Sequence, residues 1–145
     1  SKKWTFTKEH KIGWYMHFPI RVYYEDTDAG GMVYHASYVC FFERARTEFL
    51  RNKGFSQQSL LSKNIAFVVK KLEIDYKMPG RLDDLLSVET EIKEIKKASI
   101  IFEQKLWRDQ ACLSHAIVSV ASVDLLKMKP IAIPKNIRDA MVSSH

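Results

Sequence analysis

The sequence predicts an α+β fold in which a five-stranded antiparallel sheet wraps around one long central helix. One stretch of helical period, 36–52, carries an aromatic stripe, and a strand-like stretch, 18–26, comes before it. Alternating strands separated by short turns then fill 65–128. One helix cannot cover both faces of such a sheet. We therefore expect the sheet to curl around the aromatic stripe and to leave an exposed edge or face that favours self-association.

The first strand is expected from Phe18 to Asp26, because Val22, Tyr23 and Tyr24 have side chains that favour strands. A short loop follows the strand and carries the glycine pair Gly30 and Gly31. Glycine lets the backbone turn tightly and approach a neighbouring group closely. This loop joins the predicted strand to the predicted helix.

The helix is expected from Ala36 to Asn52, because its apolar side chains fall within an arc of about 100° at helical spacing. These side chains are Tyr38, Phe41, Phe42, Ala45 and Phe49. On the opposite arc, Arg44 and Glu48 have the i,i+4 spacing of an ion pair. Gly54 is a typical C-terminal stop, and a second short helix over 57–63 has Ser56 as its N-cap.

The strands after the helix show period-two alternation over 72–77 and 86–93, and the latter has one polar face. A turn at Lys96 and Lys97 leads into a third strand that includes Ile100 and Leu106. The run 116–126 is apolar on both faces. This last strand is therefore either central in the sheet or covered by a second subunit.

The chain of 145 residues fits one domain. We expect an N-terminal extension over 1–14, the domain over 15–134, and a C-terminal tail over 135–145 that can form a short helix. No apolar run approaches the roughly 20 residues of a transmembrane helix, and no secretory signal is recognisable. The cytoplasm is the expected location.

Composition limits the classes of partner and of site. The formal net charge of +6 favours anionic partners, although an ordinary solvated basic surface explains it equally well. No Lys/Arg tract of five to eight residues occurs, so nucleic acid is not expected. The two cysteines, Cys40 and Cys112, are too far apart in sequence for a C-x-x-C redox pair or a zinc knuckle, and we expect free thiols.

The loop between strand and helix holds the candidate chemistry. Asp28 is a candidate nucleophile or general base. A helix that begins near His35 presents unpaired backbone N–H groups that can polarise a carbonyl and stabilise an oxyanion. A carboxylate and such N–H donors together are the minimum set of groups needed to hydrolyse an activated acyl group. Alternatively, Asp28 caps a turn or the helix, His35 is structural, and Tyr34 is a core or rim aromatic.

Other catalytic motifs are missing from the sequence. Asp26 and Asp28 imitate the start of a calcium loop, but its fifth and twelfth positions are Gly30 and Ser37, which excludes calcium. The chain contains no G-x-S-x-G, H-E-x-x-H, G-K-[ST] or G-x-G-x-x-G motif. Serine hydrolases, zinc hydrolases, nucleotide hydrolases and dinucleotide enzymes therefore lose support.

A family resemblance adds to this interpretation. The run Y-Y-E-D-T-D-A-G-G-M-V-Y-H-A-S-Y, followed by F-F-E-R-A-R-T-E, closely resembles the bacterial Tol-Pal-associated acyl-CoA thioesterases. These form a branch of the 4-hydroxybenzoyl-CoA thioesterase group, which has the hotdog fold of a five-stranded antiparallel sheet curled around a long helix. The resemblance continues through A-F-V-V-K, I-D-Y, R-L-D-D-L, F-E-Q and K-M-K-P, and so covers nearly all of 18–134.

The resemblance implies roles for individual residues. Asp28 matches the nucleophile or general base of thioester hydrolysis. The carbonyl-polarising N–H falls on His35, whose side chain would orient water or substrate, and Tyr34 fills the aromatic position before it. Gly31 would belong to the substrate-binding loop. Lys96, Lys97 and Lys129, near predicted turns, would suit the phosphates of coenzyme A, although ordinary solvated lysines are an equally good explanation.

The resemblance also implies that no metal or redox cofactor is needed, since coenzyme A is part of the substrate. The partner would be acyl-CoA or acyl carrier protein, and the assembly a homodimer or homotetramer with active sites at subunit interfaces. One alternative is a non-catalytic module that binds acyl carrier protein, lipid-synthesis enzymes or envelope partners. Another is a hotdog dehydratase, which requires a differently placed histidine and acid.

Overall fold

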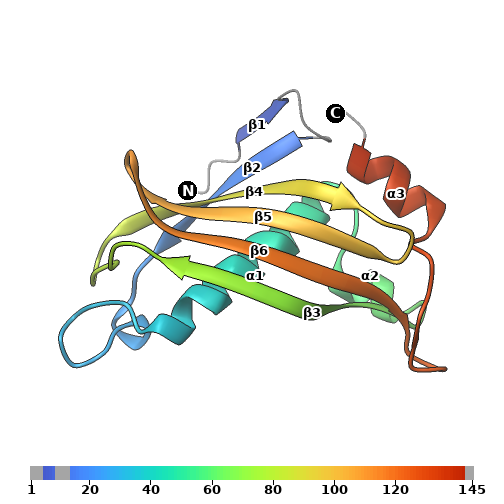
Figure 1. Cartoon of the computed structure of the whole chain (residues 1–145), viewed down its shortest axis with the longest axis horizontal. Coiled ribbons are helices and arrows are strands. Elements are labelled where there is room, and N and C mark those ends of the chain that lie inside the picture. Colours follow the sequence, from blue (N-terminus) through green and yellow to red (C-terminus); the bar gives the residue numbers. More distant parts are fainter. Residues whose placement is uncertain (1–4, 9–13, 143–145) are drawn as a thin grey trace.

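Antiparallel strands form one sheet that packs across the long helix α1 (His35–Asn52), as Figure 1 shows. This computed structural model describes residues 5–8 and 14–142, with side chains from 16 onward. Within these residues the sheet has seven strands in the order β1-β2-β4-β5-β6-β3, with β7 paired to β6. Their bounds are β1 Thr5–Lys8, β2 Trp14–Arg21, β3 Ile65–Tyr76, β4 Leu85–Ile95, β5 Ser99–Arg108, β6 Ala111–Asp124 and β7 Lys129–Pro130.

The five long strands, β2 to β6, and the helix confirm the predicted α+β fold, to which β1 and β7 add short pairings. Two further helices are short: α2 (Gln57–Leu61) and α3 (Lys135–Val142). Ser56 caps α2 as expected, by accepting a hydrogen bond from the Ser59 N–H. Residues 1–4, 9–13 and 143–145, parts of the expected extension and tail, lie outside the described residues.

The predicted aromatic stripe of α1 lies in the core between the helix and the sheet. All five of its side chains are buried, and the Phe49 ring meets Phe102 of β5 edge to face at 5.8 Å. Gly54 ends the helix with φ of 96°, and the Phe55 N–H reaches back to the Leu50 carbonyl. These are the features of a glycine C-cap.

Two local predictions are wrong. The strand expected over 18–26 is β2, which ends at Arg21, and the 3-10 turn η1 (Tyr24–Asp26) follows. The reason is local: the Asp26 carboxylate accepts the Tyr23 N–H at 2.9 Å and folds the chain into the turn. On α1, Glu48 pairs with Arg51 instead of Arg44, whose guanidinium lies over the Phe41 ring.

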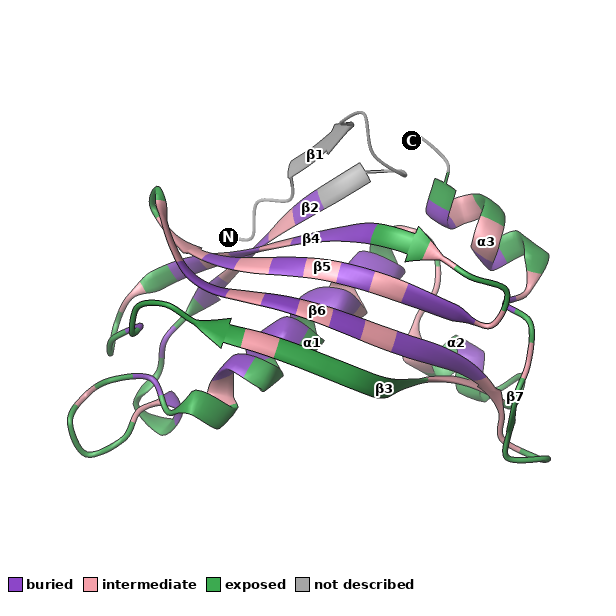
Figure 2. Ribbon diagram, in the orientation of Figure 1, coloured by how far each residue is buried: buried purple, intermediate pink, exposed green. Residues whose placement is uncertain are grey.

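The strand β6 is interior, between β5 and β3, which agrees with the first of the two alternatives given for the doubly apolar run, a central place in the sheet. β3 lies at the sheet edge and is largely exposed in Figure 2. Its exposed apolar side chains include Val68, Val69 and Leu72. An unpaired strand edge with apolar side chains is a common place for chains to associate. Self-association through this edge stays a prediction.

Candidate functional site

The loop after η1 is a small hairpin that pairs Thr27 with Val33. The Asp28 N–H donates to the Met32 carbonyl at 2.9 Å, and the Gly31 N–H donates to the Asp28 carbonyl at 3.1 Å. Gly31 has φ of 77°, a backbone conformation that favours glycine. This position explains the need for Gly31: it closes the turn that carries Asp28.

The two oxygens of the Asp28 carboxylate have different surroundings. Oδ1 accepts the Gly30 N–H at 2.9 Å and, more weakly, the Met32 N–H at 3.4 Å, as in an Asx turn. Oδ2 has no hydrogen bond or ion pair with any residue that the structure describes, and the side chain is exposed in a single chain. One oxygen therefore caps the turn, as the structural alternative expected, and the other is available for chemistry.

The neighbouring carboxylate of Asp26 has a purely local role. Asp26 is 8% exposed, and its Oδ2 holds the Tyr23 N–H. Its backbone carbonyl accepts the Tyr34 N–H at 2.8 Å. This bond places the start of α1 directly beside the hairpin that holds Asp28.

The first turn of α1 offers unpaired donors. Tyr34 is the N-cap residue and gives no side-chain cap, and the first turn contains no acidic side chain. Among the described residues, no hydrogen-bond partner accepts the backbone N–H of His35 or Ala36. Free N–H groups at a helix start carry a partial positive charge and bind anions or polarised oxygens. The prediction that a helix beginning near His35 presents unpaired backbone N–H groups agrees with this geometry.

Beside the helix start lies an open groove of about 290 Å³, lined by His35, Tyr38, Tyr76 and 77–79 among others. The Tyr76 hydroxyl, at the end of β3, donates to the His35 carbonyl at 2.9 Å. Burial, with Tyr38 nearby, raises the pKa of the Tyr76 phenol. The Tyr34 ring lies 4.5 Å from the His35 ring. Asp28 does not line this groove within one chain.

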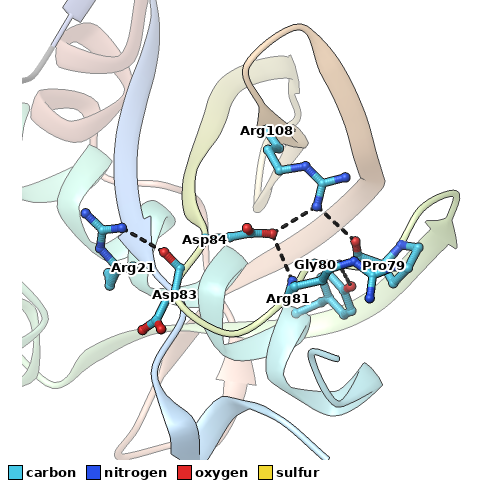
Figure 3. Close-up of polar contacts among 8 residues, drawn as sticks. Arg21, Pro79, Gly80, Arg81, Asp83, Asp84 and Arg108 are labelled. Carbon is cyan, nitrogen blue, oxygen red and sulfur yellow. Dashed lines mark hydrogen bonds and ion pairs between the residues drawn. The ribbon is translucent and has the colours of Figure 1, made fainter. Parts of the chain in front are cut away.

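A polar brace supports the hairpin from the segment 78–84, as Figure 3 shows. Asp84 Oδ2 accepts both the Arg81 N–H and the Arg108 guanidinium at 2.9 Å, and Arg108 also donates to the Pro79 carbonyl. The braced segment is hydrogen-bonded to the hairpin, because the Val33 N–H donates to the Gly80 carbonyl at 2.8 Å.

Sequence reasoning found neither this brace nor Tyr76 as part of the site. The R-L-D-D run was recognisable only as a family motif, because its partner Arg108 lies 24 residues further along the chain.

The three predicted substrate-binding lysines lie away from this loop within one chain. The segment 78–84 that receives the hairpin leads into β4, whereas Lys96 and Lys97 follow the other end of that strand. The 11 residues of β4 span about 35 Å. Lys129, on β7, pairs with Asp124 at the same far end. A single chain therefore does not bring these lysines to Asp28, and their binding role stays a prediction.

The remaining groups are simple to place. Cys40 and Cys112 are free cysteines. No group of three or more metal-ligating side chains occurs in the part of the chain that is described. Over the same residues, no helix is both long and apolar enough to cross a membrane.

Comparison with known proteins agrees with this architecture. The model of the Thioesterase superfamily matches residues 30–113. The acyl-CoA thioesterase YbgC of Haemophilus influenzae is 62% identical over 124 residues, which is 85% of this chain and 91% of that protein. The acyl-CoA thioester hydrolase YbgC of Escherichia coli O157:H7 is 54% identical over 121 residues, covering 83% and 90%.

Solved structures give the same result. A probable thioesterase from Bartonella henselae superposes with a TM-score of 0.78 at 38% identity, and the match covers 83% of this chain and 99% of that one. The sheet curled around a central helix, the long family match and the high identity to the YbgC proteins lead to one conclusion: the chain belongs to the thioesterase superfamily and has its hotdog fold.

Proposed function

We propose that the chain hydrolyses acyl-CoA thioesters to a free acid and coenzyme A, with Asp28 as the nucleophile or general base. The observation that carries the proposal is a hairpin that holds a carboxylate oxygen free of protein contacts and lies directly beside an uncapped helix start. The family and the named activity of the YbgC relatives support it.

The chemistry follows from these two groups. The thioester carbonyl oxygen accepts hydrogen bonds from the N–H groups at the start of α1. These bonds stabilise the negative charge that develops on the oxygen. Asp28 either takes a proton from the attacking water or attacks the carbonyl carbon itself, in which case water then cleaves the acyl-enzyme anhydride. The C–S bond breaks, and the thiolate takes up a proton. The His35 side chain orients water or substrate, and Tyr34 and Gly31 shape the loop around it.

We further propose that the site is completed by a second chain. Asp28 is exposed, the groove beside His35 is open, and β3 presents an apolar edge. A homodimer or homotetramer would cover these surfaces and could bring a partner chain's lysines to the coenzyme A phosphates. The same site would accept an acyl group on acyl carrier protein. Such substrates would suit the cytoplasmic location expected from the sequence.

The Asp28→Asn variant tests the catalytic assignment. Asparagine keeps an oxygen that can accept the Gly30 N–H, so the hairpin is retained while the charge is lost. We expect kcat for an acyl-CoA to fall about 100- to 10,000-fold, the usual range for a general base. His35→Ala should reduce kcat less. Asp139→Asn, an exposed site on α3, is the matched control and should hydrolyse normally.

Hydrolysis by Asp28→Asn at the wild-type rate would refute the assignment. A second candidate, a binding module for an acidic carrier protein, is favoured by the net charge of +6. Retention of acyl carrier protein on the immobilised chain, with no turnover of acyl thioesters from short to long chain lengths, would favour this module over the enzyme.

A further inference from the structure

Arg46 is a buried cation on α1, far from the residues of the candidate active site described above. It lies on the inward side of the helix, between the buried Phe42 and Phe49, and is only 8% exposed. Arginine keeps its charge at neutral pH, and burying a charge costs several kcal/mol unless it is paired. The surroundings of Arg46 therefore require an explanation.

The partners of Arg46 neutralise little of this charge. Its Nη1 donates to the Gln104 Oε1 at 3.0 Å, and no other hydrogen bond or ion pair to the guanidinium occurs among the described residues. Gln104 is fully used, because its Nε2 donates to the Phe42 carbonyl and to Thr90 Oγ1, both at 2.9 Å. Burial lowers the pKa of Arg46, and the charge of Glu43 partly opposes this effect.

A cavity of about 100 Å³ lies between α1 and the sheet, and Arg46 is one of the residues that line it. Its walls are mostly apolar, with Leu50 from the helix and Phe67, Ile100 and Val120 from the three strands β3, β5 and β6. A single water needs only about 10–15 Å³, so the cavity can hold a larger group. An apolar cavity with one cation at its wall matches a short hydrocarbon stem that ends in an anion.

The unused guanidinium donors define the anion. Only one N–H of Arg46 is occupied within the described chain, which leaves Nε and Nη2 available. A guanidinium binds a carboxylate through two parallel hydrogen bonds, and such bonds are among the strongest in proteins. Glu43 also lines the cavity, but its carboxylate accepts the Thr47 hydroxyl at 2.6 Å and is exposed, so it does not pair with Arg46.

We propose that this cavity is a binding site for a carboxylate carried on an apolar stem. Two sources have this chemistry: a free carboxylic acid, and the distal end of an acyl group whose thioester lies at the start of α1. Arg46 follows His35 by 11 residues on one helix, about 16 Å along its axis. An extended chain advances about 1.25 Å per carbon, so roughly a dozen carbons cover this distance. The second source rests on the proposed function.

The first experiment uses free probes. Hexanoate and 1-hexanol are titrated into the full chain at neutral pH, with binding followed by calorimetry. We expect hexanoate to bind about tenfold or more tightly than hexanol, as charge-assisted hydrogen bonds predict. Arg46→Met should abolish the preference. Arg44→Met, the same change at an exposed site of the same helix, should retain it.

Two more variants sharpen this test. Arg46→Lys keeps the charge but loses the forked donors, and should keep only part of the preference, which serves if Arg46→Met does not fold. Glu43→Gln removes the negative charge at the cavity wall and should tighten hexanoate binding. Equal binding of the two probes, or a preference that survives in Arg46→Met, would overturn the free-acid source.

The second experiment tests the acyl source through the ratio of kcat/KM for dodecanedioyl-CoA to that for lauroyl-CoA. A ratio of about ten or more that drops to about one in Arg46→Met supports it, and a ratio near one in the wild type overturns it. If neither experiment shows a carboxylate preference, the whole inference is wrong. The proposed function fails separately, if Asp28→Asn hydrolyses lauroyl-CoA normally, and hexanoate binding still stands in that case.

Discussion

Gln104 joins the central helix to the sheet, and its replacement by leucine gives the sharpest test of the core. The Gln104 amide accepts from Arg46 and donates to the Phe42 carbonyl and to Thr90, and the side chain is fully buried. Its orientation has a physical reason: a guanidinium can only donate, so it must face the amide oxygen. Leucine fills a similar space and offers neither acceptor nor donor.

The magnitude follows from what Gln104→Leu leaves behind. Arg46 keeps its charge but loses the one acceptor that it has among the described residues. A hydrogen bond to a charged group contributes about 1.5–3 kcal/mol to stability. Each lost neutral hydrogen bond costs about 1 kcal/mol more, which the apolar contacts of leucine roughly offset. We therefore expect a loss of about 1.5–3 kcal/mol, a substantial part of the total stability of a small domain.

The double variant Arg46→Met with Gln104→Leu reverses most of this loss. Replacing both partners by apolar side chains removes the charge together with its acceptor, and such replacements are often neutral or stabilising. We expect the double variant to be more stable than Gln104→Leu alone. Gln110→Leu, at the exposed turn between β5 and β6, is the matched control and should change stability by less than about 0.5 kcal/mol.

Urea unfolding followed by circular dichroism measures these differences. With a slope of about 2 kcal/mol per M, the midpoint of Gln104→Leu should fall by about 0.75–1.5 M. All variants are compared at one protein concentration, because association would add to the stability. A Gln104→Leu midpoint within about 0.5 M of the wild type would contradict the reasoning, as would a double variant less stable than the single one.

Two further predictions concern the hairpin and the outer face of the sheet. Gly80→Ala places a Cβ 3.0 Å from Val33 Cγ2 and should displace the Asp28 hairpin, lowering kcat/KM about tenfold; an unchanged kcat/KM would show that the hairpin tolerates the shift. Burial acts to raise the pKa of Glu103, but the hydrogen bond and charge of His115, together with smaller contributions from Lys105 and Glu91, lower the pKa below its usual 4.5. This stabilisation is present above the usual pKa and is lost as the pH falls through the lowered one. His115→Gln should therefore be less stable than the wild type at about pH 6, and the difference should shrink as the pH falls below the usual pKa of Glu103; a difference that stays the same size on acidification would count against the pair.

Much of the fold could be predicted because its signals are local. The buried stripe of α1 depends on i,i+3 and i,i+4 spacing, and the helix stop depends on the positive φ that Gly54 adopts. The end of β2 was missed because a single side chain decided it. Asp26 holds the Tyr23 N–H, and strand propensity contains no term for such a bond.

In the candidate site, too, the parts that depend on neighbouring residues could be predicted, and the parts that depend on distant contacts could not. Asp28, Gly31 and the helix start at His35 lie within eight residues of one another in the sequence, so their association is a local property of one hairpin and one helix end. The predicted lysines are not close to Asp28 in the sequence, so no local pattern places them beside it. The length of β4 also separates Lys96 from Asp28 within one chain.

The sequence by itself determined the α+β class, the central helix and the loop where a carboxylate precedes unpaired helix-start donors, because each depends on neighbours a few residues apart. Only the tertiary structure decided the contacts between distant segments. It brought Arg108 to Asp84, Tyr76 to the His35 carbonyl, and Gln104 to the buried Arg46. These contacts arise when the sheet curls around the helix, and residues 24 to 58 positions apart then meet across a space that no local pattern specifies.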